Sequence, residues 1–233
     1  MKPPKQVVLI TFLLSVTAGF CDSVTFVSLH EFFSSHITGN LVLFAYDLVI
    51  HSDKDTWTKL LSFPVFIVGV MAGGAIDSRS SGPFILLFIE GLILVVFGGI
   101  WLSMSHKGHA PGETTEYIVA MMIVFAMGLQ NAFGRIYPKK TYGPTTMMTG
   151  LVSEAALNLG AVLRSNDVYA LSEITLYRQL ITIGTFLGGC VCGAVSGKWC
   201  GLSSVLLPGI LLTIFSVNAG LSRGNGANRK CRR

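Results

Sequence analysis

Residues 83–104 read PFILLFIEGLILVVFGGIWLSM and contain a single charged side chain, Glu90. At about 1.5 Å of rise per residue, a helix of this length crosses a hydrocarbon core of about 30 Å. Further runs of the same character occupy residues 6–29, 60–77, 116–134, 176–197 and 202–220. The sequence therefore predicts an all-α polytopic membrane protein with six transmembrane helices.

The composition of the 233 residues agrees with a membrane protein. Hydrophobic residues make up 51% of the chain, and Asp, Glu, Lys and Arg together make up 12%, against about 25% in a soluble domain. The mean hydropathy is +0.63. The net charge of +5 arises from Lys and Arg at the chain ends and between the apolar runs, a pattern that orients spanning helices. We expect a lipid bilayer around the chain and no nucleic-acid partner.

Two weaker segments, 32–50 and 141–162, are apolar for only part of their length. The first contains Thr38-Gly39-Asn40 and the second contains Met148-Thr149-Gly150, so a Thr-Gly pair opens an apolar stretch in both. Glycine lets a helix break, and Thr and Asn supply polar groups where an unwound helix leaves its own unpaired. We therefore expect two broken or re-entrant segments.

Matched sequences also flank the two weak segments. Upstream, Ala18-Gly19-Phe20-Cys21-Asp22-Ser23 corresponds to Met127-Gly128-Leu129-Gln130-Asn131-Ala132. Downstream, Phe66-Ile67-Val68-Gly69 with Gly73 corresponds to Phe186-Leu187-Gly188-Gly189 with Gly193. Three matches in the same order predict two internally repeated halves, 1–104 and 105–222, followed by a basic cytoplasmic tail, 223–233.

The topology depends on whether the two weak segments cross the membrane. If they do not, each half has three spans and the halves are inverted, as in many transporters. If they do, each half has four spans and the repeats are parallel. Counting Lys and Arg does not separate the two arrangements, and both place the two termini in the cytoplasm. We predict six full spans plus two broken or re-entrant segments.

These motifs resemble the YoaK-type membrane family, which is catalogued as domain of unknown function 1275. The resemblance covers about residues 5–220. It implies a six-span, multi-pass protein of the bacterial inner (plasma) membrane and leaves the biochemical role open. It rests on Gly19-x-x-Asp22-Ser23, Thr38-Gly39-Asn40, Gly128-Leu129-Gln130-Asn131-Ala132, Thr145-Thr146 and Met148-Thr149-Gly150.

Two acidic residues inside apolar runs are candidates for proton coupling. Asp22 lies about sixteen residues into the first run, and Glu90 lies near the middle of residues 83–104. A carboxylate at bilayer depth costs about 2.5 kcal/mol or more, so such residues are usually partnered and functional. Two simpler roles compete with this one. Asp22 could hydrogen-bond a neighbour near a helix end, and Glu90 could join helices as a neutral acid.

The predicted substrate site surrounds the two helix breaks. Paired breaks at matching points of two halves are the best sequence indication of a transport site. The same residue types also serve helix packing, and the glycine-rich helices suit contacts between copies of the chain in a homo-oligomer. The site residues are Asp22, Thr38, Gly39, Asn40, Gln130, Asn131, Thr149 and Gly150.

The sequence has no nucleophile elbow or phosphate-binding loop, and its five His have no zinc-ligand spacing. We therefore expect no enzyme activity, no cofactor and no metal site. The first hypothesis is a transporter of a small polar solute or ion, with its site at the two Thr-Gly breaks. The alternative is a non-transporting membrane interaction or sensory protein, and an intramembrane enzyme ranks below both.

Overall fold

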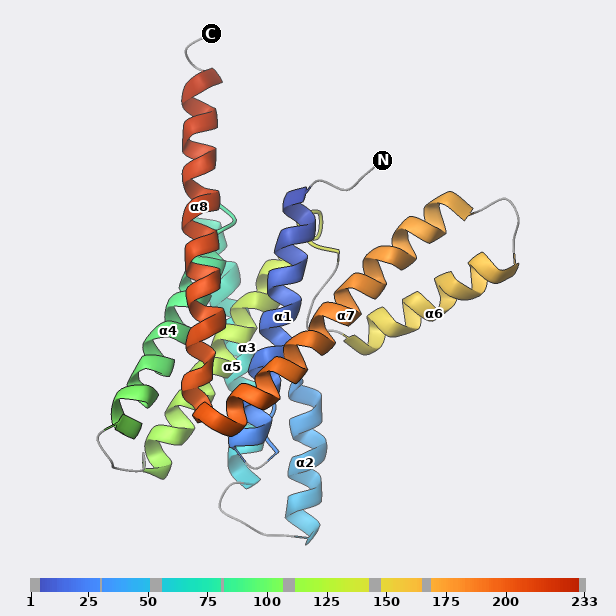
Figure 1. Cartoon of the computed structure of the whole chain (residues 1–233). Coiled ribbons are helices and arrows are strands. Elements are labelled where there is room, and N and C mark those ends of the chain that lie inside the picture. The colour runs from blue at the N-terminus through green and yellow to red at the C-terminus, as the bar shows by residue number, and fades with distance from the viewer. Residues whose placement is uncertain are drawn as a thin grey trace.

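The computed structural model is helical throughout its secondary structure (Figure 1). It describes residues 5–29, 31–50, 56–80, 82–106, 112–142, 148–164 and 169–230; of these, Lys5, 169–173 and 222–230 are described in backbone only. The α-helices are α1 (Lys5–Ser28), α2 (Ile37–Ile50), α3 (Thr56–Arg79), α4 (Ile85–His106), α5 (Glu113–Ile136), α6 (Met148–Arg164), α7 (Tyr169–Cys200) and α8 (Leu206–Lys230).

Within the described residues, five continuous helical runs are long and apolar enough to cross a membrane. The last of them, Ile174–Leu221, contains the two predicted spans 176–197 and 202–220. These two parts meet at a short 3-10 turn, Gly201–Val205, where Gly201 has a φ of 58°. The other runs coincide with the remaining predicted spans and are Gln6–Ser28, Thr56–Arg79, Ile85–His106 and Glu113–Ile136. A helical membrane protein is therefore confirmed, and the count of six crossings stays a prediction.

The two weak segments contain the short helices α2 and α6. Helix α2 has 14 residues and α6 has 17, whereas a full crossing needs about 20. Residues 31–36 before α2 are not helical. The corresponding stretch before α6 includes Thr145 and Thr146, which lie outside the described residues. Both helices are shorter than a typical crossing, and whether they enter the membrane without crossing it stays a prediction.

Helices α1 and α7 run in the same direction and pack closely. Gly19, Gly189 and Gly193 lie at this crossing, where a methyl group on each would overlap the backbone carbonyl oxygen of Phe186, Val16 and Phe20, respectively. Small residues spaced by four allow backbones to approach in this way. The glycines therefore set the distance between the first and seventh helices.

Helices α3 and α5 pack in the same manner. A methyl group on Gly69 would lie 2.6 Å from the carbonyl oxygen of Phe125, and one on Gly128 would lie 2.8 Å from that of Phe66. In the sequence repeat, Gly128 matches Gly19 and Gly69 matches Gly189. The two crossings are thus made by corresponding residues, and the pair α3–α5 runs opposite to the pair α1–α7 (Figure 1).

A third close crossing joins α4 and α8, which are antiparallel. Gly91 faces the backbone of Gly209, and a methyl group on Gly209 would lie 2.8 Å from Cβ of Leu94. Most of the glycine-rich faces are therefore used inside the chain. Contacts between copies of the chain, which the sequence also suggested, stay a prediction.

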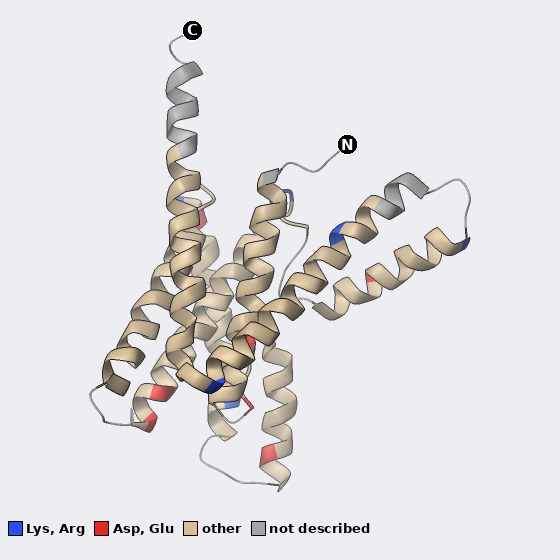
Figure 2. Ribbon diagram, viewed as in Figure 1, with Lys and Arg blue, Asp and Glu red and all other residues tan. Residues whose placement is uncertain are grey.

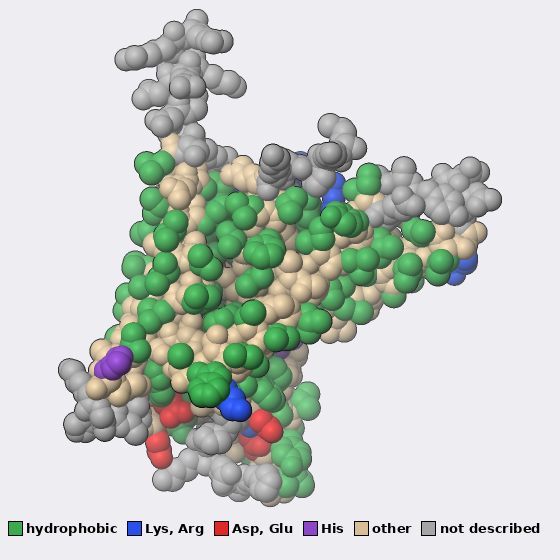
Figure 3. Space-filling model, viewed as in Figure 1, with side chains coloured by type: hydrophobic (Ala, Val, Ile, Leu, Met, Phe, Trp, Pro, Cys, Tyr) green, Lys and Arg blue, Asp and Glu red, His purple; other side chains and the backbone are tan. Residues whose placement is uncertain are grey.

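The surface of the described part is apolar over most of its height. Val42, Met71, Leu157 and Trp199 are each between 68% and 80% exposed, and hydrophobic side chains are spread over the face seen in Figure 3. Such exposure suits lipid and would be unfavourable in water. Helix α8 continues without a break into the predicted tail as far as Lys230.

The glycine crossings generate a matched test on adjacent residues of α7. Gly189→Ala pushes a methyl group into the Val16 carbonyl, whereas nothing lies within 4 Å of the position that a methyl group would take at Gly188. Overpacking costs about 1–3 kcal/mol, so we expect Gly189→Ala to be less stable than Gly188→Ala by about that amount. Equilibrium unfolding in mixed detergent micelles measures the difference, and equal stability would contradict the packing described for α1 and α7.

Candidate functional site

The carboxylate of Asp22 on α1 holds the non-helical residues that precede α2. Its Oδ1 accepts hydrogen bonds from the backbone N–H of Ser35 at 2.6 Å and from the hydroxyl of Ser34 at 3.1 Å. Its Oδ2 accepts from the Ser35 hydroxyl at 2.6 Å and lies 2.5 Å from Nδ1 of His36. Asp22 is only 3% exposed. This buried carboxylate is therefore fully occupied by donors from the chain itself.

A sharp reversal after α1 brings those donors back to Asp22. The N–H of Glu31 donates to the carbonyl of Phe26 at 3.2 Å, and Glu31 adopts a φ of 65°. Asp22 lies six residues before the end of α1, so residues 34–36 return about 9 Å along the helix. The chain thus re-enters the bundle before α2 begins.

Asn40 on α2 forms hydrogen bonds to the same non-helical segment before α2. Its Oδ1 accepts from the N–H of Phe33 at 2.8 Å, and its Nδ2 donates to the Phe33 carbonyl at 2.7 Å and to the Ser62 hydroxyl at 2.9 Å. The side chain is fully buried. Asn40, predicted as a substrate-binding residue, therefore satisfies backbone groups that would otherwise be unpaired.

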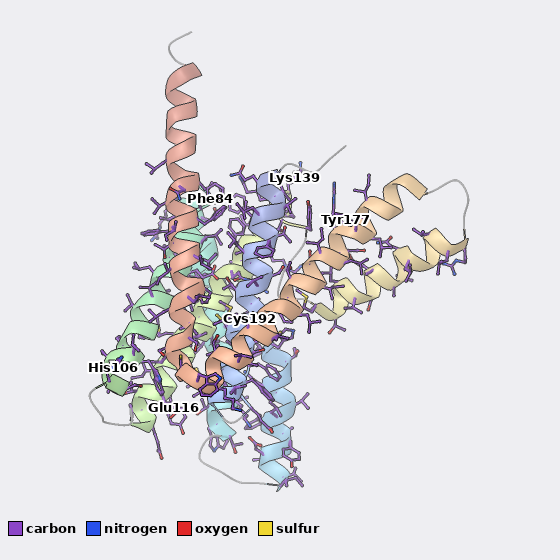
Figure 4. The ribbon with its side chains drawn as sticks, in the orientation of Figure 1. Phe84, His106, Glu116, Lys139, Tyr177 and Cys192 are labelled. Carbon is purple, nitrogen blue, oxygen red and sulfur yellow. The ribbon has the colours of Figure 1, made fainter. Side chains whose placement is uncertain are left out.

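Two adjoining cavities lie on either side of the re-entrant segment. The outer cavity, of about 590 Å³, lies against α1, α2 and α7; Figure 4 labels Cys192 where α7 passes α1. It is lined by Asp22, Ser23, Phe26, Val27, Phe33, His36, Thr38, Gly39, Phe186, Cys190 and Ala194. The inner cavity, of about 290 Å³, is lined by Ser35, His36, Ile37, Thr38, Phe66, Asn131, Met148, Thr149 and Gly150. His36 and Thr38 line both.

The inner cavity brings together the two Thr-Gly segments. Thr38 comes from the first segment and Thr149 and Gly150 from the second, 111 residues further along the chain. Asn131, at the position that corresponds to Asp22, lines the same cavity. Four residues of the predicted substrate site therefore share one space, and Asp22 and Gly39 line the adjoining outer cavity.

Gln130 and Glu90 lie elsewhere. Gln130 is 1% exposed, and its Nε2 donates to the Leu14 carbonyl at 2.9 Å, which ties α5 to α1. Glu90 is fully buried in α4, and neither of its carboxyl oxygens has a hydrogen-bond partner among the described residues. Neither residue lines the inner or the outer cavity.

Reasoning from the sequence did not assign several lining residues to the site, among them His36, Phe66 and Phe186. His36 was grouped with the scattered histidines, although it stands two residues before the first Thr-Gly pair. Phe66 and Phe186 each open a matched Phe-x-x-Gly motif, and their rings line the inner and outer cavity, respectively. Phe66 and Phe186 could have been identified from the internal repeat, because each opens one of its matched motifs.

His36 lies between α1 and α2 and pairs with the carboxylate of Asp22. The hydrogen bond with Asp22 raises the pKa of His36 above its ordinary value, and the negative charge of Asp22 acts in the same direction, whereas burial lowers it. Within the described residues, no three His, Cys, Asp or Glu side chains group as metal ligands. The imidazole of His36 can exchange a proton, and the hydroxyl and amide groups that line the inner cavity can form hydrogen bonds.

Comparison with known families places the chain. A family model described as "Protein of unknown function (DUF1275)" matches residues 10–218 of the 233, so the chain belongs to this family. No curated protein and no solved structure matches it. The family was correctly identified from the motifs around Asp22 and the two Thr-Gly pairs.

The ion pair between Asp22 and His36 makes stability depend on pH. Because the pKa of His36 is raised in the folded chain, its contribution is complete below the ordinary value of 6.5 and is lost as the pH rises through the raised value. We expect the melting temperature in detergent to fall as the pH rises above 6.5, and His36→Gln to flatten the fall. His106→Gln, at the exposed end of α4, is the control. An unchanged slope in His36→Gln would show that the pair does not hold the segment.

Proposed function

We propose that this chain is a transporter of a small polar solute or ion and that its substrate site is the inner cavity. One observation carries the proposal: Thr38 and Thr149, from segments far apart in the sequence, line the same space. Each segment begins a short apolar helix, and the cavity offers hydroxyl, amide and imidazole groups. Discontinuous helices that meet around a polar site are the usual design of transporter binding sites.

The arrangement of the helices supports an inverted repeat. The pairs α1–α7 and α3–α5 are made by corresponding glycines and run in opposite directions (Figure 1). Two halves related in this way can rock around a fixed central site and expose it to either face in turn. We therefore propose six crossings, three in each half, with α2 and α6 as re-entrant helices.

The charge distribution supports an inner (plasma) membrane location with both termini in the cytoplasm. Helices α1 and α8 begin and end, respectively, at the same end of the molecule (Figure 1). Arg79 ends α3 and Arg135 lies in the last turn of α5 at that end, and Lys139 and Lys140 follow (Figures 2 and 4). Glu113 and Glu116 open α5 at the opposite end. An excess of Lys and Arg marks the cytoplasmic side.

Proton coupling is assigned to Asp22 acting with His36, with Glu90 as the second candidate. Asp22 and His36 line the outer cavity, and His36 also lines the inner cavity. Glu90 lies in the closely packed region where Gly91 meets α8. A buried carboxyl group with no hydrogen-bond partner among the described residues fits either a proton carrier or a neutral packing group.

We propose transport rather than catalysis, and the alternative is a non-transporting membrane interaction or sensory protein. The alternative predicts that the inner cavity has no role in moving solutes. A flux measurement on the purified chain separates the two, because only a transporter gives movement above that of empty liposomes.

The flux test uses proteoliposomes and four labelled probes: rubidium, chloride, glycine and lactate. We expect at least one probe to move faster than in empty liposomes, and Thr38→Val and Thr149→Val to slow it. Loss of one hydrogen bond of about 0.5–1.5 kcal/mol corresponds to a slowing of about 2- to 10-fold for each variant. Thr185→Val is the matched control, because that hydroxyl bonds within α7 and lines neither cavity. Flux equal to that of empty liposomes for every probe would favour the alternative.

The pH dependence of that flux identifies the coupling residue. We expect His36→Gln to flatten the dependence, because it removes the titrating partner of Asp22 at the cavities. Glu90→Gln keeps the size of the side chain and should leave the dependence in place, since Glu90 lines neither cavity. A flattened profile in Glu90→Gln alone would transfer the coupling role to Glu90.

A further inference from the structure

The outer cavity has apolar, largely aromatic walls. The ring centroids of Phe26 and Phe33 lie 4.9 Å apart, and those of His36 and Phe186 lie 5.6 Å apart in an edge-on arrangement. The volume of about 590 Å³ falls within the usual range of small-molecule sites. Walls of this kind favour a ligand with an apolar body.

The outer cavity opens toward the lipid-facing surface. Val27 lines it and is 46% exposed, and Leu187 and Val191 on the adjacent face of α7 are 62% and 58% exposed. These side chains face hydrocarbon in a membrane. A ligand that reaches the cavity by this route must itself dissolve in the bilayer.

The polar end of the outer cavity is not suited to a cation. The two oxygens of Asp22 already take up donors from Ser34, Ser35 and His36, so the carboxylate has little capacity left for another. Nδ1 of His36 faces Asp22, so Nε2, on the other side of the ring, points away from that carboxylate, and His36 lines the outer cavity. When His36 has lost the proton that it carries in the ion pair and its remaining Nδ1 proton is directed at Asp22, the neutral ring presents a basic lone pair at Nε2.

We propose that the outer cavity binds a membrane-soluble weak acid, with its apolar body between the aromatic rings and its carboxyl group at Nε2 of His36. In the bound state the O–H bond of the acid breaks and its proton forms the Nε2–H bond, which leaves a carboxylate against an imidazolium. No net charge is created in the apolar site, and Asp22 stabilises the imidazolium from the other side of the ring. Release of the acid returns the proton by the reverse step.

This inference names a ligand class for the outer cavity and rests on the proposed function only for a transport step after binding. His36 and Thr38 also line the inner cavity, so an acid held at His36 lies next to the proposed transport site. Binding to the outer cavity does not itself require transport. The two ideas can therefore fail separately.

The test measures binding of three tritiated ligands that share an eight-carbon body: octanoate, 1-octanol and octylamine. The full chain is held in nanodiscs, and empty nanodiscs give the background. We expect octanoate to bind above background, octylamine to stay at background, and His36→Gln to weaken octanoate binding at least tenfold. Ala194→Phe, which fills the outer cavity, should weaken the binding of both octanoate and octanol. His106→Gln is the control variant.

Several results would overturn the proposal. Octanoate bound equally by the native chain and His36→Gln would remove the role of Nε2, and octylamine bound as tightly as octanoate would show a site for cations. Octanoate at background in the native chain would exclude the site altogether. Specific binding of octanoate without protein-dependent octanoate flux in proteoliposomes would leave the site standing and count against transport.

Discussion

Lipid chains offer no hydrogen bonds to the N–H and C=O groups of backbone that is not helical. Other groups of the protein must therefore bond these N–H and C=O groups wherever such a segment lies at membrane depth. Under the proposed topology residues 33–36 lie at that depth, and Asp22 and Asn40 meet the constraint for them. Asp22 accepts the Ser35 N–H, and Asn40 pairs with both backbone groups of Phe33. His36 and Thr38, which separate the two cavities, are positioned by this segment. The site therefore depends on one carboxylate and one amide that contact the chain itself.

The close helix crossings connect the frame to the site. The carbonyl oxygen of Phe186 lies against Gly19, and that of Phe66 lies against Gly128. The ring of Phe186 lines the outer cavity and meets the His36 ring, while the ring of Phe66 lines the inner cavity. Each phenylalanine thus packs its backbone at a crossing and presents its side chain to a cavity. A shift between the crossing helices would move a cavity wall with it.

Much of this frame could be predicted from the sequence, because uninterrupted apolar runs leave a chain few alternatives to spanning helices. The matched Thr-Gly pairs could also be found in the sequence, and Thr38, Thr149 and Gly150 line the inner cavity; their role in binding a substrate stays a prediction. What a sequence cannot supply is the rotation of each helix about its own axis. Asn40 and Gln130, both predicted as site residues, donate hydrogen bonds to the backbone carbonyls of Phe33 and Leu14, and these partners could not be read from the sequence. The pairing of Asp22 with His36 requires a chain reversal that begins at Glu31, a residue type that rarely adopts a positive φ.

The two repeated halves differ at one pair of corresponding positions beside the cavities, Asp22 and Asn131. Asp22 is a carboxylate bonded to an imidazole, whereas its counterpart Asn131 carries an amide that does not titrate. Among the described residues that line the inner cavity, the titratable group is His36 from the first half, which is bonded to Asp22. If the halves are inverted as proposed, this group would make the cavity respond to pH differently from the two faces of the membrane. The paired helix crossings, which are alike in the two halves, would not create that difference.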